Sequence, residues 1–549
     1  MKNYLFKSLQ MSENEEYHEE EEEEISKIPK DVLHYAYKIA DLQNLLMDLT
    51  PENIDDSIQD LKDNQYTTDK SLLKSFISHL LEVPDFRPAK ISLLCNFMNK
   101  LFESIQSEET IKSIQDELLR QLFLSVSNPG PFPNESSRPH FLFQLYQKGV
   151  LSIESINGLL QKFIDNYTWF CDPVAWLVCY FFDLVPEDIY EEARRRVSRS
   201  KDVNPLFKKF FDDHHYGDPL ENAERKSMNP YVEMLRNDDV EGLNTLLNPL
   251  YNYDFIIKPS IFEECWFIQR EPSLILCAAY FGSVKCFKFL MLNHASLQMR
   301  DQDSRSLAQF AVAGGNIEII RLVEQAGCDF SDTIHIATHF CHPDIFEWLH
   351  LTKFPDLTKD NFDVYSILHH AAYSGSIGLL VKCINSGCDV NKFTNPLYRQ
   401  TPILKAAENG KSDAVKILLS VPEIDPNVKC NSETPLIFAA RNGRDECVKL
   451  LCNSEKVKVN TVADLGTALH YAAAYCQTDV VRILLDSERI DISIRNQKGE
   501  TAYNIAQRAR AYEVQNLLSG HRSFFSPFFD FLSRYGYLIV VLLLIILSQ

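Results

Sequence analysis

Two stretches decide the fold of this chain, TPILKAAENG at residues 401–410 and TPLIFAARNG at residues 434–443. Each begins with Thr-Pro, has two alanines in its second half and ends on glycine, and they start 33 residues apart. Proline is tolerated in the first turn of a helix, because the N–H that it lacks would have no partner there. Glycine ends a helix readily in the left-handed conformation. The pattern predicts a short helix repeated at a fixed spacing.

Related segments continue on both sides of this pair, each aligned on one alanine. The aligned alanines are Ala278, Ala311, Ala337, Ala371, Ala406, Ala439, Ala472 and Ala506. The steps between them are 33, 26, 34, 35, 33, 33 and 34 residues. A period near 33 indicates stacked supersecondary units. The step of 26 predicts that the turn after Cys328–Phe330 has lost its projecting hairpin.

Each unit continues into a second helix, predicted by apolar residues at helical spacing such as Ala414, Val415 and Leu418. Over about residues 273–519 the units resemble the ankyrin repeat, TPLHxAAxxG…VxxLLxxGADvN. Residues 229–272 look like the cap of a divergent ankyrin family expanded in protists. The resemblance implies an all-α solenoid with a concave groove for folded proteins. Cys476 stands at a glycine position, which predicts a strained or reshaped helix cap.

The rest of the chain divides by composition. Residues 1–24 are predicted to be an acidic disordered tail, because Glu19–Glu24 is an unbroken charge run. Residues 25–228 are predicted to form an α-helical module that packs on the repeats, with breakers at Pro51, Pro84, Pro88 and 128–139. Its apolar run Val174–Phe182 has nine residues, which suits a buried helix.

Charge and cysteine content restrict the function. The 549 residues carry a formal charge of −21, which disfavours non-specific nucleic-acid binding, since that needs basic surface. Fourteen cysteines, with no CxxC and no secretory signal, predict reduced cytosolic thiols and no zinc site. Cys383/Cys388 and Cys447/Cys452 share a spacing, but their repeat registers differ, so they are not copies of one site.

Three motifs resemble catalytic or modified sites. His335 and His339 are spaced as in zinc proteases, but the general-base glutamate is missing. His335, His369 and His470 occupy the consensus histidine of the repeat, and the resemblance implies that they hydrogen-bond between loops. Gly410-Lys411-Ser412 lacks the earlier glycine of a phosphate loop. Ser198, after three arginines, is either a kinase acceptor or part of a basic helix end that balances Glu191 and Glu192. No catalytic residue, cofactor or metal is predicted.

The partner-binding residues are expected on the concave face, just after the alanine pairs. Aromatic and arginine side chains often anchor protein interfaces. The predicted residues are Tyr280, Phe281, Tyr373, Glu408, Arg441 and Tyr475. For Tyr280 and Phe281 the alternative is packing against the N-terminal module.

Residues 520–549 form a hydrophobic tail and a predicted membrane anchor. Tyr535–Leu547 holds 13 residues without a charge, which span only about 20 Å of helix. Residues 528–549 reach about 30 Å if Arg534 lies at the interface. The alternative is a buried helix that caps the repeats, although LIVVLLLIIL is apolar on all sides.

The leading functional hypothesis is a non-enzymatic scaffold that binds protein partners, not nucleic acid. It is expected at the cytoplasmic face of an intracellular membrane, or otherwise in the cytoplasm. A second hypothesis is a soluble substrate adaptor for ubiquitin ligation, from a faint F-box likeness in IPKDVLHYAYKIADLQNLL. An enzyme or channel subunit is the third; a single terminal apolar segment cannot build a multi-span channel.

Overall fold

The fold was analysed in a computed structural model. The described residues are 26–127, 137–166, 172–199, 205–214, 229–248, 252–260, 265, 267–357, 366–394 and 399–520. They form helices and connections without a β-strand, so the all-α prediction is confirmed for them. Contacts divide the chain into two compact units, unit 1 (residues 1–425) and unit 2 (residues 426–549).

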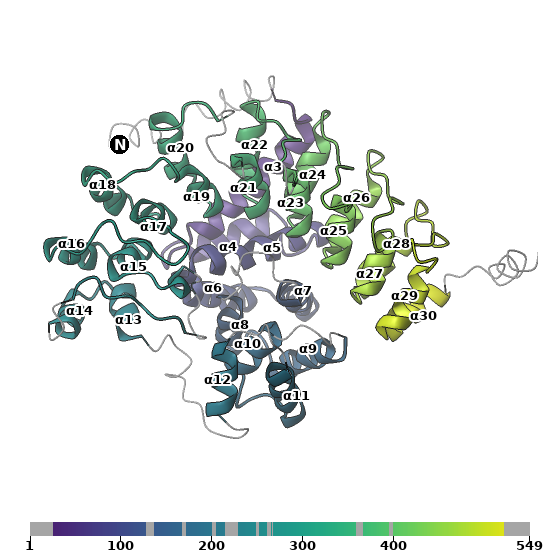
Figure 1. Ribbon diagram of the computed structural model, residues 1–549, viewed down its shortest axis with the longest axis horizontal. Coiled ribbons are helices and arrows are strands. Elements are labelled where there is room, and N and C mark those ends of the chain that lie inside the picture. The colour runs from purple at the N-terminus through teal and green to yellow at the C-terminus, as the bar shows by residue number, and fades with distance from the viewer. Residues whose placement is uncertain are drawn as a thin grey trace, which may run out of the picture. The chain divides into compact units, whose positions relative to one another are not determined.

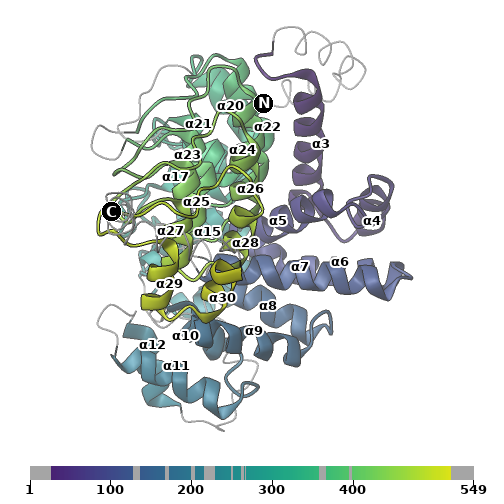
Figure 2. The same ribbon diagram turned by 90° about the vertical axis from the view of Figure 1, so that its right-hand side faces the viewer.

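The N-terminal part of unit 1 is helical throughout its described residues (Figures 1 and 2), as predicted for residues 25–228. Its helices are α3 (Lys30–Met47), α4 (Ile54–Asp63), α5 (Lys70–Phe86), η2 (Pro88–Lys90), α6 (Ile91–Ser104), α7 (Glu108–Ser127), α8 (Ser137–Gln147), α9 (Ile153–Asn166), α10 (Asp172–Tyr180), α11 (Glu187–Arg199) and α12 (Pro205–Asp213). The predicted buried helix near Val174–Phe182 is α10, whose last residues and Phe182 are buried.

One predicted break in this module is wrong. Pro84 was expected to separate two helices, but it lies inside α5. Proline removes one helical hydrogen bond and forces the preceding backbone aside, and α5 accommodates this by ending two residues later at Phe86. The Arg87 N–H still bonds to the Val83 carbonyl at 2.6 Å. The proline therefore shortens the helix at its end without interrupting it.

The repeats of unit 1 follow as pairs of antiparallel helices. They are α13 (Pro230–Arg236), α14 (Val240–Leu247), the turn η4 (Ile268–Arg270), α15 (Leu274–Phe281), α16 (Val284–Leu292), α17 (Leu307–Gly314), α18 (Ile317–Gln325), α19 (Ile334–His339), α20 (Pro343–Thr352), α21 (Ile367–Ser374), α22 (Ile377–Asn385), α23 (Pro402–Glu408) and α24 (Ser412–Ser420). The first helix of each pair packs on the first helix of the next, as α15 does on α17 and α21 on α23. The second helices α22 and α24 also contact α3 of the N-terminal module.

The N-terminal module and the repeats up to Asp425 belong to the same compact unit, because helices from both pack together. In Figure 2, α3 and α5 lie along one side of the repeat helices of unit 1.

The predicted shortening in the third repeat is confirmed. Residues 326–333 connect α18 to α19, whereas 293–306 connect α16 to α17. The shorter link has no room for the projecting turn. The helix that follows, α19, is also the shortest first helix of the stack, with six residues.

Unit 2 continues the same pattern. Its helices are α25 (Pro435–Arg441), α26 (Asp445–Asn453), α27 (Ala468–Ala474), α28 (Thr478–Leu485), α29 (Ala502–Ala509) and α30 (Tyr512–Gly520). The first helices α25, α27 and α29 pack on one another in order. Their aligned alanines, Ala439, Ala472 and Ala506, are fully buried.

The predicted left-handed caps are present. The glycines at 282, 315, 375, 410 and 443 have φ between 67° and 77°. Cys476 takes the same conformation with φ 56°, which confirms the prediction of a strained cap. Cys341 (φ 51°) and Arg510 (φ 58°) hold the equivalent position in two other units, and the sequence analysis did not single them out. At these three caps a residue other than glycine adopts the left-handed conformation, which costs about 1 kcal/mol or more.

Two predicted segments lie outside the described residues, the acidic tail 1–24 and the hydrophobic tail after Gly520. Within the described part of the chain, no helix has both the length and the apolar character needed to cross a membrane. The described cysteines are all free thiols, and all but Cys328 and Cys476 are buried.

Relief of cap strain should stabilise unit 2. Replacing Arg510 with glycine is expected to raise the free energy of unfolding by about 1 kcal/mol, because the left-handed penalty disappears and the Arg510 side chain is exposed. Cys476→Gly should act in the same direction. Urea unfolding of the full chain, followed by circular dichroism, measures both.

The matched control is Gly443→Ala, which places a Cβ in the same conformation (φ 67°) and only 2.4 Å from Gln477 Oε1. Gly443→Ala should therefore lower the free energy of unfolding. Stabilisation by Gly443→Ala, or a loss of stability in Arg510→Gly, would contradict the assigned cap geometry.

Candidate protein-interaction surface

The residues two positions after each aligned alanine hold the same register position on the first helices, called here the groove column of each unit. In unit 1 it holds Tyr280, Ala313, His339, Tyr373 and Glu408, and in unit 2 it holds Arg441, Ala474 and Arg508. Four of the six predicted partner-binding residues are members of the column, namely Tyr280, Tyr373, Glu408 and Arg441. Phe281 and Tyr475 each lie one position beyond a member. Their surroundings differ strongly along the stack.

Two of the predicted residues are buried. Tyr280 is 6% exposed, and its ring stacks on Phe267 with centroids 5.2 Å apart. Glu408 is 9% exposed and pairs with Lys405 Nζ at 3.1 Å. These two side chains are used inside unit 1 and have little surface to offer a partner.

Phe281 and Tyr373 are half-buried. The Arg236 guanidinium lies 5.2 Å from the Phe281 ring centroid, so α15 packs on α13 at this end of the stack. The Tyr373 ring stacks on His339 of the preceding unit with centroids 5.4 Å apart. Two successive members of the groove column, His339 and Tyr373, therefore stack on each other.

Unit 2 presents the remaining predicted residues with part of their surface exposed. Arg441 forms an ion pair with Glu433 at 2.9 Å, and its guanidinium lies 4.6 Å from the Phe438 ring centroid. A guanidinium held by a carboxylate and a ring has little conformational freedom left to lose on binding. Tyr475, at the end of α27, is half-buried.

The sequence analysis missed Arg508. It stands at the register of Arg441 and pairs with Glu500, as Arg441 pairs with Glu433, eight residues earlier in both cases. The signal was available, because both arginines lie two positions after an aligned alanine. Unit 2 therefore repeats one Arg–Glu arrangement on α25 and α29.

The consensus histidines act as predicted at two positions. His369 Nδ1 accepts from the Ser366 N–H at 3.3 Å, and its Nε2 donates to the Gln400 carbonyl of the next loop at 3.0 Å. His470 repeats this with Thr467 and the Glu500 carbonyl, at 3.1 and 3.2 Å. Burial lowers the pKa of His369 to about 4, so the ring is neutral, as this hydrogen-bond pattern requires.

The His335 and His339 pair has an aromatic environment. The His335 ring lies 5.0 Å from that of His370, and His339 contacts Phe86 of α5 edge-on at 5.6 Å. Burial lowers the pKa of His335 to about 4 and that of His339 to about 3. Both imidazoles therefore belong to the packing of the inner helices.

A buried polar network joins α5 to the repeats within unit 1. His79 Nε2 lies 3.0 Å from Asp413 Oδ2, and its Nδ1 lies 2.8 Å from Glu82 Oε2. Lys411 Nζ donates to Glu82 Oε1 at 2.8 Å. His79, Glu82 and Asp413 are only 3%, 1% and 5% exposed. Because both nitrogens of His79 face carboxylate oxygens, both carry protons, and two cations balance two anions.

Hydroxyl and amide groups complete the network. Tyr35 donates to Asp413 Oδ1 at 2.6 Å, and Ser75 to the same oxygen at 3.1 Å. Gln43 of α3 donates to the Gly375 carbonyl at 2.6 Å and accepts from the Ile377 N–H at 2.9 Å. A buried charge network is stabilising only when its members are satisfied, and here the acceptors of Asp413 and Glu82 are matched by donors.

The charges of this network raise the pKa of His79 and lower the pKa values of Glu82 and Asp413. Burial lowers the pKa of His79, but the charge of Glu82 and the hydrogen bonds to Asp413 and Glu82 outweigh it and raise the pKa to about 9. Burial raises the pKa of Glu82, but Lys411 and His79 outweigh it and lower the pKa to about 2. The pKa of Asp413 is lowered as well, with the His79 contact outweighing burial.

This network also explains Gly410-Lys411-Ser412. Gly410 ends the first helix with φ 73°, as predicted, and Lys411 binds Glu82 of α5. Nearby, Arg87 donates to His342 Nδ1 at 2.9 Å, and His342 Nε2 donates to the Ala313 carbonyl at 3.0 Å. The turns between paired helices are therefore where the N-terminal module is attached.

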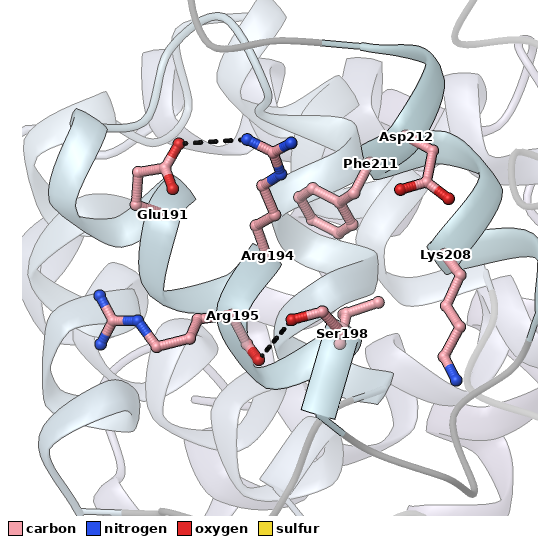
Figure 3. Close-up of a pocket in the computed structure, with 8 residues that line it drawn as sticks. Glu191, Arg194, Arg195, Ser198, Lys208, Phe211 and Asp212 are labelled. Atoms are coloured by element: carbon pink, nitrogen blue, oxygen red, sulfur yellow. Dashed lines mark hydrogen bonds and ion pairs between the residues drawn. The ribbon is translucent and has the colours of Figure 1, made fainter.

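An open surface pocket of about 550 Å³ lies between α11 and α12 (Figure 3). It is lined by Glu191, Arg194, Arg195, Val197, Ser198, Lys208, Phe211 and Asp212. Arg194 pairs with Glu191 at 3.7 Å and Arg195 with Glu192 at 2.5 Å, so the basic helix end balances these glutamates as predicted. The Ser198 hydroxyl donates to the Arg195 carbonyl at 2.9 Å within the helix. Its phosphorylation stays an untested alternative.

Stacked helix pairs with a shared inner face define a helical repeat protein, a class that binds through extended surfaces. The comparison with known families names the repeat. Residues 368–463 match the model for ankyrin repeats (three copies), and residues 464–497 match the model for the ankyrin repeat. Residues 368–497 of the chain are therefore ankyrin repeats. No curated protein matches the chain. The protist resemblance stays a prediction.

The network predicts a pH optimum for the attachment of the N-terminal module. A pKa of His79 raised from 6.5 to about 9 adds stability below pH 6.5, which is lost as the pH rises to 9. At 1.36 kcal/mol per unit this is at most about 3 kcal/mol. The Glu82 contribution is present above pH 4.5 and is lost as the pH falls towards 2. The buried neutral rings of His335, His339 and His369 act in the opposite direction, because below pH 6.5 the unfolded chain binds protons that these residues do not bind in the folded chain. Urea unfolding of the full chain should therefore show greatest stability near pH 6.5 and a decline from there to pH 9.

Two histidine variants test the assignment. His79→Gln should lower stability at pH 6 and remove the decline between pH 6.5 and 9. His369→Gln should leave that decline in place, because His369 is already neutral there. A decline that persists in His79→Gln would assign it to another group.

Proposed function

We propose that this protein is a non-enzymatic ankyrin-repeat scaffold that binds a protein partner through the groove column of unit 2, and that residues 528–549 hold it on the cytoplasmic face of an intracellular membrane. The match of residues 368–497 to ankyrin repeats carries the first part of the proposal. Ankyrin repeats are interaction modules, so a protein partner follows from the family.

The choice of unit 2 rests on the exposure of its side chains and on the ion pairs that fix their conformation. In unit 1 Tyr280 and Glu408 are buried and Phe281 and Tyr373 are half-buried. In unit 2 Arg441 and Tyr475 are half-buried and Arg508 is exposed. Arg441 and Arg508 are both held by carboxylates, at 2.9 and 2.6 Å. Preorganised arginine and tyrosine are the residue types that most often anchor interfaces.

Affinity purification of the tagged full chain tests this surface. Arg441→Ala and Arg508→Ala should each reduce recovery of the same co-purifying protein by about tenfold or more, since an interface anchor contributes at least 1–2 kcal/mol. Arg482→Ala is the matched control, because Arg482 is an ion-paired arginine of the same unit on the second helix α28. Equal recovery with all three variants would contradict the groove assignment.

The membrane part rests on sequence alone, since residues 521–549 lie outside the described residues. The aliphatic run Leu538–Leu547 offers no polar face to a protein partner, and each buried CH₂ contributes about 0.8 kcal/mol in hydrocarbon. Arg534 would lie at the interface, where a long side chain reaches water.

Leu543→Arg should release the protein from membranes, because a charge near the middle of the span costs about 2.5–3.5 kcal/mol. Carbonate extraction and fractionation measure the release, and Leu543→Ile is the matched control. Truncation after Gly520 should have the same effect as Leu543→Arg. A parent protein already in the soluble fraction would contradict the anchor and favour a buried cap.

The ubiquitin-ligation alternative has no observation in its favour. Its F-box-like segment largely coincides with α3, whose residues Leu33, Ala36 and Ile39 are buried and which packs on α22 and α24. A recruiting surface would have to come from another part of the module.

A further inference from the structure

Two cysteines meet at the end of α22. The helix ends at Asn385, and Gly387 follows in the left-handed conformation with φ 86°. The Gly387 N–H bonds to the Ile384 carbonyl at 3.0 Å, and the Cys388 N–H bonds to the Cys383 carbonyl at 3.1 Å. These two bonds define a Schellman cap, in which the side chains on either side of the longer bond come into contact.

Other repeats place ordinary apolar residues at this contact. The same longer bond joins Ala295 to Leu290, Cys328 to Val323 and Phe354 to Leu349, at 3.0 to 3.2 Å. In α22 both positions are cysteine, so a packing contact becomes a pair of thiols. Both residues are buried, Cys383 fully and Cys388 to 8% exposure, and the Cys388 thiol donates to the Leu357 carbonyl at 3.6 Å.

We propose that Cys383 and Cys388 form a reversible redox-modification site, in which a peroxide oxidises the two thiols to a disulfide across the α22 cap. Cys388 is the more accessible of the two and reacts first. Its pKa is lowered, chiefly because the Cys383 thiol donates a hydrogen bond to it, whereas the pKa of Cys383 is raised well above the usual value. A thiolate at Cys388 is the nucleophile that oxidation requires.

The chemistry balances in two steps. The Cys388 thiolate attacks one peroxide oxygen, the O–O bond breaks, and the products are a sulfenic acid and hydroxide, which takes a proton to become water. The Cys383 sulfur then attacks the Cys388 sulfur, the S–O bond breaks, and a second water leaves with the Cys383 proton. Two thiols and one hydrogen peroxide give one disulfide and two waters. A dithiol such as dithiothreitol reverses the reaction.

The chain contains a matched internal control. Cys447 and Cys452 have the same five-residue separation, but both lie inside α26 (Asp445–Asn453) with no cap between them. Residues five apart in a continuous helix point about 140° away from each other. Sequence spacing alone would treat the two pairs alike; only the first has the backbone geometry that brings its sulfurs together.

Peptide mass spectrometry of the full chain tests the proposal. The reduced protein is treated with hydrogen peroxide, alkylated and cut with trypsin, which yields residues 383–392 (CINSGCDVNK) as one peptide. This peptide should be lighter by two hydrogen atoms and unalkylated, and dithiothreitol treatment before alkylation should restore both labels. Cys447 and Cys452 should remain separately alkylated.

Single variants identify the order of events. In Cys383→Ser, Cys388 should be captured as a sulfenic acid by dimedone; in Cys388→Ser, Cys383 should not be captured. Full alkylation of residues 383–392 after peroxide, while the half-buried Cys328 and Cys476 are oxidised, would overturn the proposal. A Cys447–Cys452 disulfide formed in the same yield as the Cys383–Cys388 disulfide, in a chain whose circular dichroism is unchanged, would also overturn the proposal. The cap geometry would then not decide which pair reacts.

Discussion

Close packing of the first helices at the aligned alanines is the constraint on which the structure depends. At these positions the side chain is a methyl group buried between neighbouring helices, as at Ala278, Ala406 and Ala472. A larger residue would separate the helices and break the stack, because each repeat buries its apolar face only against its neighbours. The glycine caps follow from the same constraint, since a short helix must reverse within a few residues to return beside the next.

The turns made by those caps have a second use in unit 1. They present backbone and charged groups, such as the Gly375 carbonyl and Lys411, to the N-terminal module. Gln43 of α3 and His79 and Glu82 of α5 make polar contacts with these turns and with α24. Turns that only connect two helices in some repeats therefore also form an internal interface in unit 1.

The inner face is likewise not uniform. In unit 1 the groove column includes aromatic rings and Glu408, which forms a buried pair with Lys405; in unit 2 it includes the half-buried Arg441 and the exposed Arg508, each paired with a glutamate. The repeat register predicted which positions lie on this face. It could not predict that Tyr280 and Glu408 are buried, because their burial depends on Phe267 and Lys405, which no repeat consensus specifies.

Periodicity and local backbone chemistry were enough to determine the helix pairs, the shortened third repeat and the left-handed caps, since all of these depend on residues within one or two units. The roles of His369 and His470 followed from the resemblance to the ankyrin repeat. The Pro84 error arose because a proline near the end of a helix costs only the last bonds. Only the tertiary structure decided where the N-terminal module attaches and which groove residues remain exposed. His79 and Asp413 are 334 residues apart and follow no shared period. Their pairing depends on burial and charge balance in three dimensions, which no spacing in the sequence records.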